Sequence, residues 1–350
     1  MIVNNARSAI HATAQNYGPV AFFHVTRLKG GKAVIIARVQ IRYVVGSVIA
    51  CLLAMQSIGI VMADGGLVSM HNDGFGIQGT IVHYPLVRLI FWGSEWANGW
   101  VDNDTSNPYG MGSAKAEAYI TNFFTNMGSP PVGGATWHHI FENQYCQGVP
   151  AGTIHCGYPN PNPNVVFISG MSGVLNTIVD NVAVPQFPAV SDVASEAAKI
   201  AANYSYDPRV LYMLFPPTHK YVNAYPCTLG PGYGHDSVNT SSGTIAFGFI
   251  EYPDVAGCRH LVNATDDSLG HGYYDKYSIT SAHEWAEMVT DQFGFSWFNN
   301  SPSTGEVADM CPGSDPTNYL NFAWYGGYDH FAAQRIWTNE WQGTGGCAYR

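Results

Sequence analysis

The stretch from Tyr277 to Val289 reads YSITSAHEWAEMV, and it is the most informative part of the sequence for the fold. Its apolar residues recur with the period of a helix, and a serine or threonine near its start is a suitable N-cap. Residues four apart share one helix face, so His283 and Glu287 point the same way. Glu284, the residue after His283, lies beside them on the helix surface. Apolar neighbours surround all three, so we expect a buried helix whose charged groups have partners.

The spacing of these three residues is typical of metal-dependent peptidases. An imidazole and a carboxylate one helical turn apart can ligate one metal ion, and Glu284 between them can act as general base toward water. In the H-E-x-x-H motif the second ligand is a His, whereas here it is Glu287. A carboxylate is a normal zinc ligand but discriminates less against other divalent ions. H-E-x-x-E alone is a weak motif, since it also occurs on ordinary solvated helix faces.

Residues 305–311 read GEVADMC and bring two more carboxylates, Glu306 and Asp309, to a segment that a cysteine can anchor. Catalytic zinc sites use three protein ligands and leave one position open, so this segment is expected to supply the third. His235, in the Gly-rich loop expected after Cys227, is a further candidate to line the same cleft.

The composition is that of a folded chain with few charges. Charged residues make up 11% of the 350 residues, less than half of their share in an ordinary soluble domain. Hydrophobic residues make up 46% and aromatic residues 13%, which excludes disorder for most of the length. A net charge of -10 without a basic run argues against nucleic acid as a partner.

The amino-terminal part differs from the rest. Residues 1–63 hold six Lys or Arg and no acidic residue. The apolar residues 44–55 are followed by a short polar break at 56–57 and then by Val61-Met62-Ala63, with small residues at positions suited to cleavage. This order predicts a secretory signal peptide cleaved after Ala63. The residues before it are explained either by a start codon chosen too far upstream or by a disordered cytoplasmic extension. The alternative is an uncleaved signal anchor, the one case in which we expect membrane association. We therefore expect an extension plus signal over 1–63 and a single domain over 64–350.

The cysteines also favour export. Of seven, Cys51 lies within the expected signal and six remain, an even number that an oxidising compartment would pair. Fifteen connectivities are possible for six cysteines. Proximity in the sequence favours the pairs Cys146–Cys156, Cys227–Cys258 and Cys311–Cys347.

Apolar and helical segments alternate along the chain, which predicts a mixed or parallel sheet covered by helices. The expected strands are 86–92, 165–169, 210–215 and 244–252, and the expected helices besides the motif helix are 113–127 and 191–202. We expect these elements to form one loop-rich domain.

The motif helix and the segments after it resemble a secreted group. The run from Thr280 to Asp291, then Trp297 and GEVADMC, resembles the pattern S-H-E-x-x-E-x-x-T-D-P, W, E-I-G-D-x-C. The stretch 334–339 before Cys347 looks like that group's W-S-N ending. Upstream, the strand ending in IFWGS and the helix with adjacent phenylalanines are similar to the plant phosphate-induced protein 1 (EXORDIUM-like) family. The similarity covers roughly residues 85–350.

The resemblance implies an extracellular, zincin-like domain of the α+β class, with a mixed sheet and helices, loop-rich and stabilised by disulfides. It implies His283 and Glu287 as metal ligands, Asp309 as the third ligand with Glu306 as its competitor, and Glu284 as the base. The implied metal is zinc, with another divalent ion as the alternative.

The function implied is that of a secreted zinc-dependent peptidase acting on peptide or protein substrates. Two departures from the pattern, Gln292 in place of Pro and Val307-Ala308 in place of Ile-Gly, leave the expected ligands untouched. The plant relatives are associated with cell-wall growth, so the alternative is a non-catalytic extracellular protein that keeps the fold, with or without a metal, and contacts cell-wall polymers.

Overall fold

The computed structural model describes thirteen stretches of the chain, all within one compact unit, Gly66–Arg350. The expected extension and signal over 1–63 lie outside the described residues and stay a prediction. Within the described part, no helix is both long enough and apolar enough to cross a membrane. The described stretches are 71–72, 80–101, 112–127, 142–150, 153–168, 173–222, 232–253, 274–294, 296–299, 305–311, 319–323, 330–339 and 346–348.

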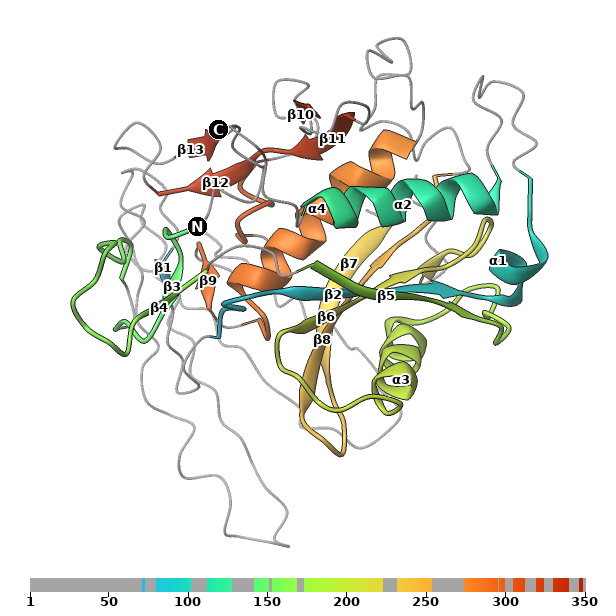
Figure 1. Ribbon diagram of the computed structural model, residues 1–350, viewed down its shortest axis with the longest axis horizontal. Coiled ribbons are helices and arrows are strands. Elements are labelled where there is room, and N and C mark those ends of the chain that lie inside the picture. Colours follow the sequence, from blue (N-terminus) through green and yellow to red (C-terminus); the bar gives the residue numbers. More distant parts are fainter. Residues whose placement is uncertain are drawn as a thin grey trace, which may run out of the picture. The chain divides into compact units, whose positions relative to one another are not determined.

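A five-stranded mixed sheet forms the centre of this unit (Figure 1). Four of its strands run parallel, and β7 pairs antiparallel with β8 at one edge. In spatial order the strands are β5 (Gly173–Asp180), β2 (Leu86–Trp92), β6 (Val210–Phe215), β8 (Thr244–Ile250) and β7 (Tyr233–Asn239).

Helices cover both faces of the sheet, which is why β2 and β6 are nearly continuous apolar runs. Leu89 and Phe91 of β2 pack in one core cluster with α2 (Ser113–Met127) and α4 (Tyr274–Thr290). Ile90 of β2 packs in the opposite cluster with α3 (Val190–Ala201). Figure 1 shows α2 and α4 on one side of the sheet and α3 on the other.

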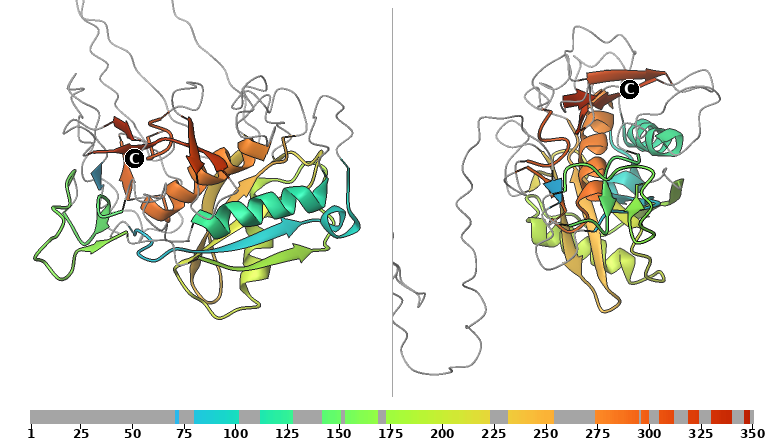
Figure 2. Two further views of the ribbon diagram at one scale, coloured as in Figure 1. Left: turned by 45° about the horizontal axis from the view of Figure 1, so that its top comes forward. Right: turned by 90° about the vertical axis from the view of Figure 1, so that its left-hand side faces the viewer.

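Helix α4 lies between the sheet and β11 (His330–Gln334), and every one of its residues is buried. Figure 2 shows the carboxy-terminal strands on the side of α4 away from the sheet. Gly248 of β8 permits the close approach of the helix, because a Cβ there would lie 3.1 Å from Sδ of Met213 and 3.2 Å from Cε of Met288. The motif helix is thus held in the core, as its apolar residues predicted.

Short elements surround this core. They are α1 (Ser94–Asn98) and four antiparallel pairs: β1 (His71–Asn72) with β9 (Trp297–Phe298), β3 (Cys146–Gln147) with β4 (Val166–Phe167), β10 (Tyr319–Ala323) with β11, and β12 (Ile336–Thr338) with β13 (Gly346–Ala348).

Two disulfides tie these peripheral segments together, Cys146–Cys156 and Cys311–Cys347, and both confirm predicted pairs. The third predicted pair, Cys227–Cys258, lies outside the described residues.

The α+β class with a mixed sheet is confirmed, and three elements differ from expectation. The segment expected as a sheet strand at 165–169 forms only the short β4 of a peripheral pair, and β5 takes its place in the sheet. Helix α4 begins at Tyr274, one turn before the motif. His235 lies on β7 and not in a loop, because ladder pairing with β8 extends the strand back to Tyr233.

Candidate metal centre

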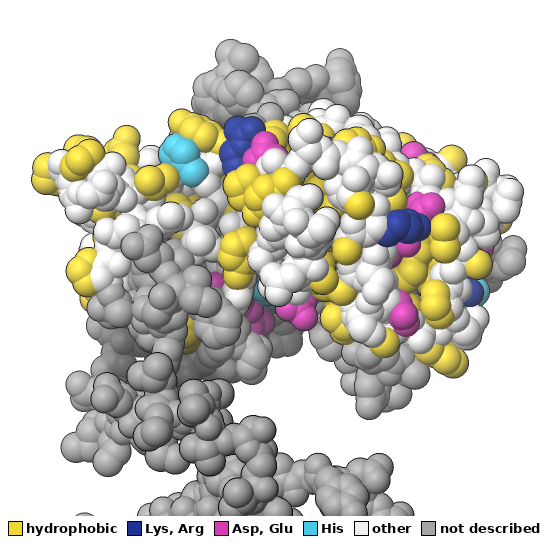
Figure 3. All heavy atoms as spheres, turned by 90° about the horizontal axis from the view of Figure 1, so that it is seen from below, with side chains coloured by type: hydrophobic (Ala, Val, Ile, Leu, Met, Phe, Trp, Pro, Cys, Tyr) yellow, Lys and Arg dark blue, Asp and Glu magenta, His cyan; other side chains and the backbone are white. Residues whose placement is uncertain are grey.

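A pocket of about 370 Å³ opens beside α4, and all six residues singled out from the sequence line it. Its walls come from the edge strand β7, from α4 and the residues that follow it, and from the turn at 305–311. On the face seen in Figure 3, acidic side chains gather close to a His near the middle of the described surface. The lining residues are Tyr233, Gly234, His235, Asp236, Ser237, His283, Glu284, Glu287, Gln292, Phe293, Gly294, Glu306 and Asp309.

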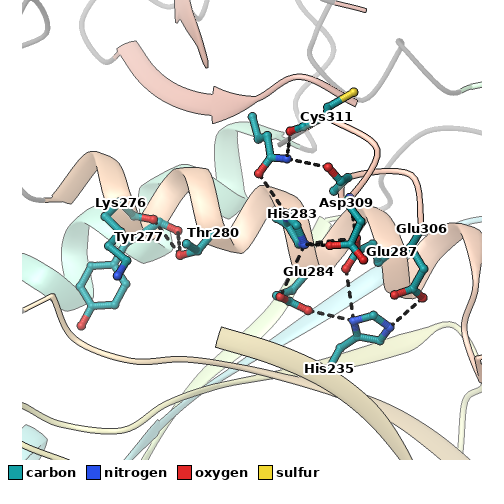
Figure 4. A network of polar contacts seen from close by, with 12 residues as sticks. His235, Lys276, Tyr277, Thr280, His283, Glu284, Glu287, Glu306, Asp309 and Cys311 are labelled. Atoms are coloured by element: carbon teal, nitrogen blue, oxygen red, sulfur yellow. Dashed lines mark hydrogen bonds and ion pairs between the residues drawn. The ribbon is translucent and has the colours of Figure 1, made fainter. Parts of the chain in front are cut away.

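His283, Glu287 and Asp309 direct their ligand atoms at one point (Figure 4). Nε2 of His283 lies 3.1 Å from Oε1 of Glu287 and 3.5 Å from Oδ1 of Asp309. The helical spacing of His283 and Glu287 produces the first contact, and the turn at 305–311 brings Asp309 to the second. His283 and Glu287 are buried, whereas the Asp309 side chain is 29% exposed, so the point they share is open toward solvent on the Asp309 side.

This donor set fits a small divalent cation. Ligands at about 2.0–2.2 Å from a tetrahedral zinc ion lie about 3.4 Å from one another. The separations of 3.1 and 3.5 Å at His283 bracket that value. One imidazole and two carboxylates are also an ordinary catalytic ligand set, with a fourth position left for water or substrate.

Gln334 of β11 sets the orientation of the His283 ring. The Gln334 amide nitrogen donates to the carbonyl oxygens of Ala308 (2.7 Å) and Cys311 (2.5 Å), so its Oε1 must face His283. Nδ1 of His283 lies 2.9 Å from that oxygen and therefore donates to it. In the neutral form of the ring Nε2 is then the unprotonated nitrogen, and this is the form that binds metal.

The turn that carries Asp309 is anchored from several directions. The Cys311–Cys347 disulfide links it to β13, and the backbone N–H of Trp337 donates to the carbonyl of Val307 over 2.8 Å. The backbone N–H of Asp309 donates to Oε1 of Glu287 over 3.2 Å. These contacts fix Asp309 relative to α4, as the sequence predicted from the cysteine at its end.

Glu284 lies beside the three-residue cluster. Its Oε1 is 4.0 Å from Nε2 of His283, too far for a hydrogen bond, while its Oε2 lies 2.8 Å from Nδ1 of His235. Nε2 of His235 lies 3.3 Å from Oε1 of Glu306. Glu306, the competing third ligand in the sequence interpretation, is therefore directed at His235, and Asp309 at His283.

The side chains that line the pocket carry an excess of negative charge, which a bound cation can balance. Five carboxylates line the pocket, those of Asp236, Glu284, Glu287, Glu306 and Asp309, and no Lys or Arg occurs among its described lining residues. Burial raises the pKa of Glu287, and His283 opposes this shift. Burial and then the charge of Glu287 raise the pKa of Glu306. Uncompensated buried carboxylates are costly, so a cation stabilises this arrangement.

The pKa values of the two histidines are also raised, but here the neighbouring carboxylates raise them against the effect of burial. Burial alone would lower the pKa of His283, but Glu287 and Asp309 raise it well above its ordinary value. Burial would likewise lower the pKa of His235, but Glu284 and Glu306 raise it well above the ordinary value. Either protons or a metal ion can therefore supply the positive charge that the carboxylates require.

Comparisons with models of protein families, with curated proteins and with solved structures give no match to this chain. The likeness to the EXORDIUM-like group therefore stays a prediction. Gln334 had no role in the sequence interpretation, because a neutral amide far from the motif carries no spacing signal. Another histidine, His155, is exposed and does not line the pocket.

Proposed function

We propose that this chain is a secreted, metal-dependent peptidase of zincin-like fold, with zinc as the metal. The observation that carries the proposal is the convergence of His283, Glu287 and Asp309 on one point with Glu284 beside it. The six cysteines and the predicted signal segment support an extracellular location.

The residues have distinct roles in this proposal. A divalent cation held by His283, Glu287 and Asp309 would supply Lewis-acid chemistry, activating water and polarising a carbonyl group. Glu284 accepts the proton of the attacking water and returns it to the leaving amine. Gln334 holds the His283 ring in its ligating tautomer, and Tyr233 packs edge-on against that ring at 5.1 Å between centroids.

The position of β7 supports a peptide as the substrate. Residues Tyr233 to Ser237 of this strand line the pocket, and within the described chain β7 pairs only with β8. We take this second edge, which no described strand covers, to offer backbone N–H and C=O groups beside the pocket. An extended peptide can add to such an edge as a further strand, with its carbonyl groups beside the candidate metal centre.

The test compares the full chain, purified with zinc, with its Glu284→Gln variant. Gln keeps the size and hydrogen bonding of the side chain but cannot accept a proton at ordinary pH. We expect cleavage of unfolded protein substrates to fall by about 10²-fold or more while zinc content and thermal stability stay at the wild-type level. Cleavage is read by mass spectrometry, with chelator-treated protein as the second control.

Two results would end the peptidase proposal. Zinc-loaded wild type that cuts nothing in a broad peptide library would favour the non-catalytic extracellular protein, which has no activity to lose. Equal cutting by Glu284→Gln would show that another group, or a contaminating protease, performs the cleavage.

A further inference from the structure

We infer that His235 of β7 is a positioning residue for Glu284, and that Glu306 in turn orients His235. This inference rests on the proposed function, in which Glu284 is the base. It assigns a role to two residues of the pocket that are not needed to hold the metal.

The geometry is a carboxylate–imidazole–carboxylate chain that joins three separate elements (Figure 4). Nδ1 of His235 lies 2.8 Å from Oε2 of Glu284, and Nε2 lies 3.3 Å from Oε1 of Glu306. All three side chains are almost entirely withdrawn from solvent, with at most 13% exposed. An imidazole between two carboxylates can donate to both, so the ring is held at its two ends.

The consequence for Glu284 concerns which oxygen faces the metal centre. A glutamate has three side-chain torsions and can point its carboxylate in several directions. The hydrogen bond from His235 holds Oε2, so that Oε1 is turned toward His283, 4.0 Å from its Nε2. Fixing the base in one productive orientation is worth a large factor in rate, because an error of about 1 Å in placement can cost 10²-fold.

A second metal ion is the rival explanation, since His235, Glu284 and Glu287 also place ligand atoms close together. The distances favour the hydrogen bond. Nδ1 of His235 is 2.8 Å from Glu284, the length of a charge-assisted hydrogen bond and shorter than the separation of about 3.4 Å between ligands of a tetrahedral zinc ion. Nδ1 of His235 lies 3.5 Å from Oε2 of Glu287, beyond a normal hydrogen bond, so Glu284 and not Glu287 is its hydrogen-bond partner.

The hydrogen-bonded series Glu284–His235–Glu306 also gives each of the two carboxylates of the 305–311 turn its own partner. Asp309 faces His283, and Glu306 faces His235. One turn, anchored by the Cys311–Cys347 disulfide, thus supports both the ligand set and the base.

The experiment uses the zinc-loaded full chain and three variants. His235→Leu removes both hydrogen bonds. His235→Asn keeps a donor, because the Asn amide nitrogen occupies the place of Nδ1 while nothing replaces Nε2. His155→Leu is the matched control, since His155 is exposed and lies outside the pocket. Peptide hydrolysis, zinc content and the ¹⁵N NMR signals of the His235 ring are measured, the ring signals being identified by their loss in His235→Leu.

For His235→Leu we expect kcat to fall by about 10- to 100-fold, the usual effect of removing such a supporting partner, with KM and zinc content little changed. His235→Asn should recover most of the lost kcat, and His155→Leu should match wild type. The inference is wrong if His235→Leu leaves kcat unchanged. It is also wrong if wild type binds two zinc ions and His235→Leu binds one, because His235 would then be a ligand.

The NMR measurement separates this inference from the peptidase proposal. In wild type, Nδ1 of His235 should carry a proton, and its signal should move in Glu284→Gln. If the protein has no peptidase activity but this signature is present, the hydrogen bond to Glu284 stands and the function proposed for Glu284 falls. An Nδ1 without a proton would overturn the inference whatever the activity.

Discussion

His283 donates from Nδ1 to Oε1 of Gln334 over 2.9 Å, although 51 residues separate the two along the chain. The contact joins α4 to β11, and the Gln334 amide continues it to the turn that carries Asp309. The ligand helix and the third-ligand turn are therefore coupled through one buried amide. A substitution of Gln334 should therefore weaken metal binding even though it removes no ligand.

The first prediction concerns that amide. In Gln334→Leu the His283 ring loses its partner and two backbone carbonyls lose their donor, so zinc affinity should fall by about 10- to 100-fold. Stability should also fall, by about 1–3 kcal/mol for buried groups left unpaired. Zinc competition with a chelating dye and urea unfolding measure the two effects. Unchanged zinc affinity in a folded Gln334→Leu variant would show that the ring needs no such support.

The second prediction separates the two acidic residues of the turn. Asp309→Ala should lower bound zinc far below one equivalent, because Oδ1 of Asp309 faces Nε2 of His283. Glu306→Ala should keep its zinc, because Glu306 faces His235. Elemental analysis of the dialysed proteins decides the matter, and the opposite order would make Glu306 the third ligand.

The third prediction concerns Glu196 of α3, away from the pocket. Burial, and then a hydrogen bond with Asp180, raises the pKa of Glu196 from 4.5 to about 7, although Lys199 opposes this. A carboxyl whose pKa is raised on folding stabilises the fold fully below its unfolded pKa, and the effect is lost as pH rises through the folded value. Wild type should therefore lose more stability than Glu196→Gln between pH 5 and pH 8 in urea unfolding. Equal losses would contradict the raised pKa.

The fourth prediction concerns the cysteines. Two predicted disulfides are present in the structure, and an oxidising compartment should pair Cys227 with Cys258 as well. Thiol titration of the denatured, secreted protein should find no free thiol, or one if Cys51 is retained. Two or more free thiols among the six remaining cysteines would remove the main support for secretion.

The elements that could be predicted from the sequence are those whose local pattern of apolar residues matches their burial in the fold. The apolar runs of β2 and β6 are buried on both faces, and the helix period of α2 matches its core contacts. Strand β5 escaped prediction because it is an edge strand whose apolar residues are partly exposed, Leu175 at 44% and Val179 at 37%. The extent of β7 depends on its pairing with β8, which no local pattern records.

Some features of the candidate site could likewise be predicted from local spacing, and others could not. Helical spacing predicted that His283 and Glu287 share a face, and the structure places them together. Spacing alone could not decide between Glu306 and Asp309, because the conformation of a turn sets where each side chain points. The partners His235 and Gln334 come from strands far away in the sequence, so their contacts with Glu284 and His283 arise only from the tertiary fold.

The most direct test of the central claim is an anomalous-scattering map of crystals grown with zinc, recorded on both sides of the zinc absorption edge. We predict one strong site bonded to Nε2 of His283, Oε1 of Glu287 and Oδ1 of Asp309 at about 2.0–2.2 Å, with Glu284 beside it and not bonded. A map without zinc in this pocket, or with zinc bonded to His235 instead of His283, would contradict the account.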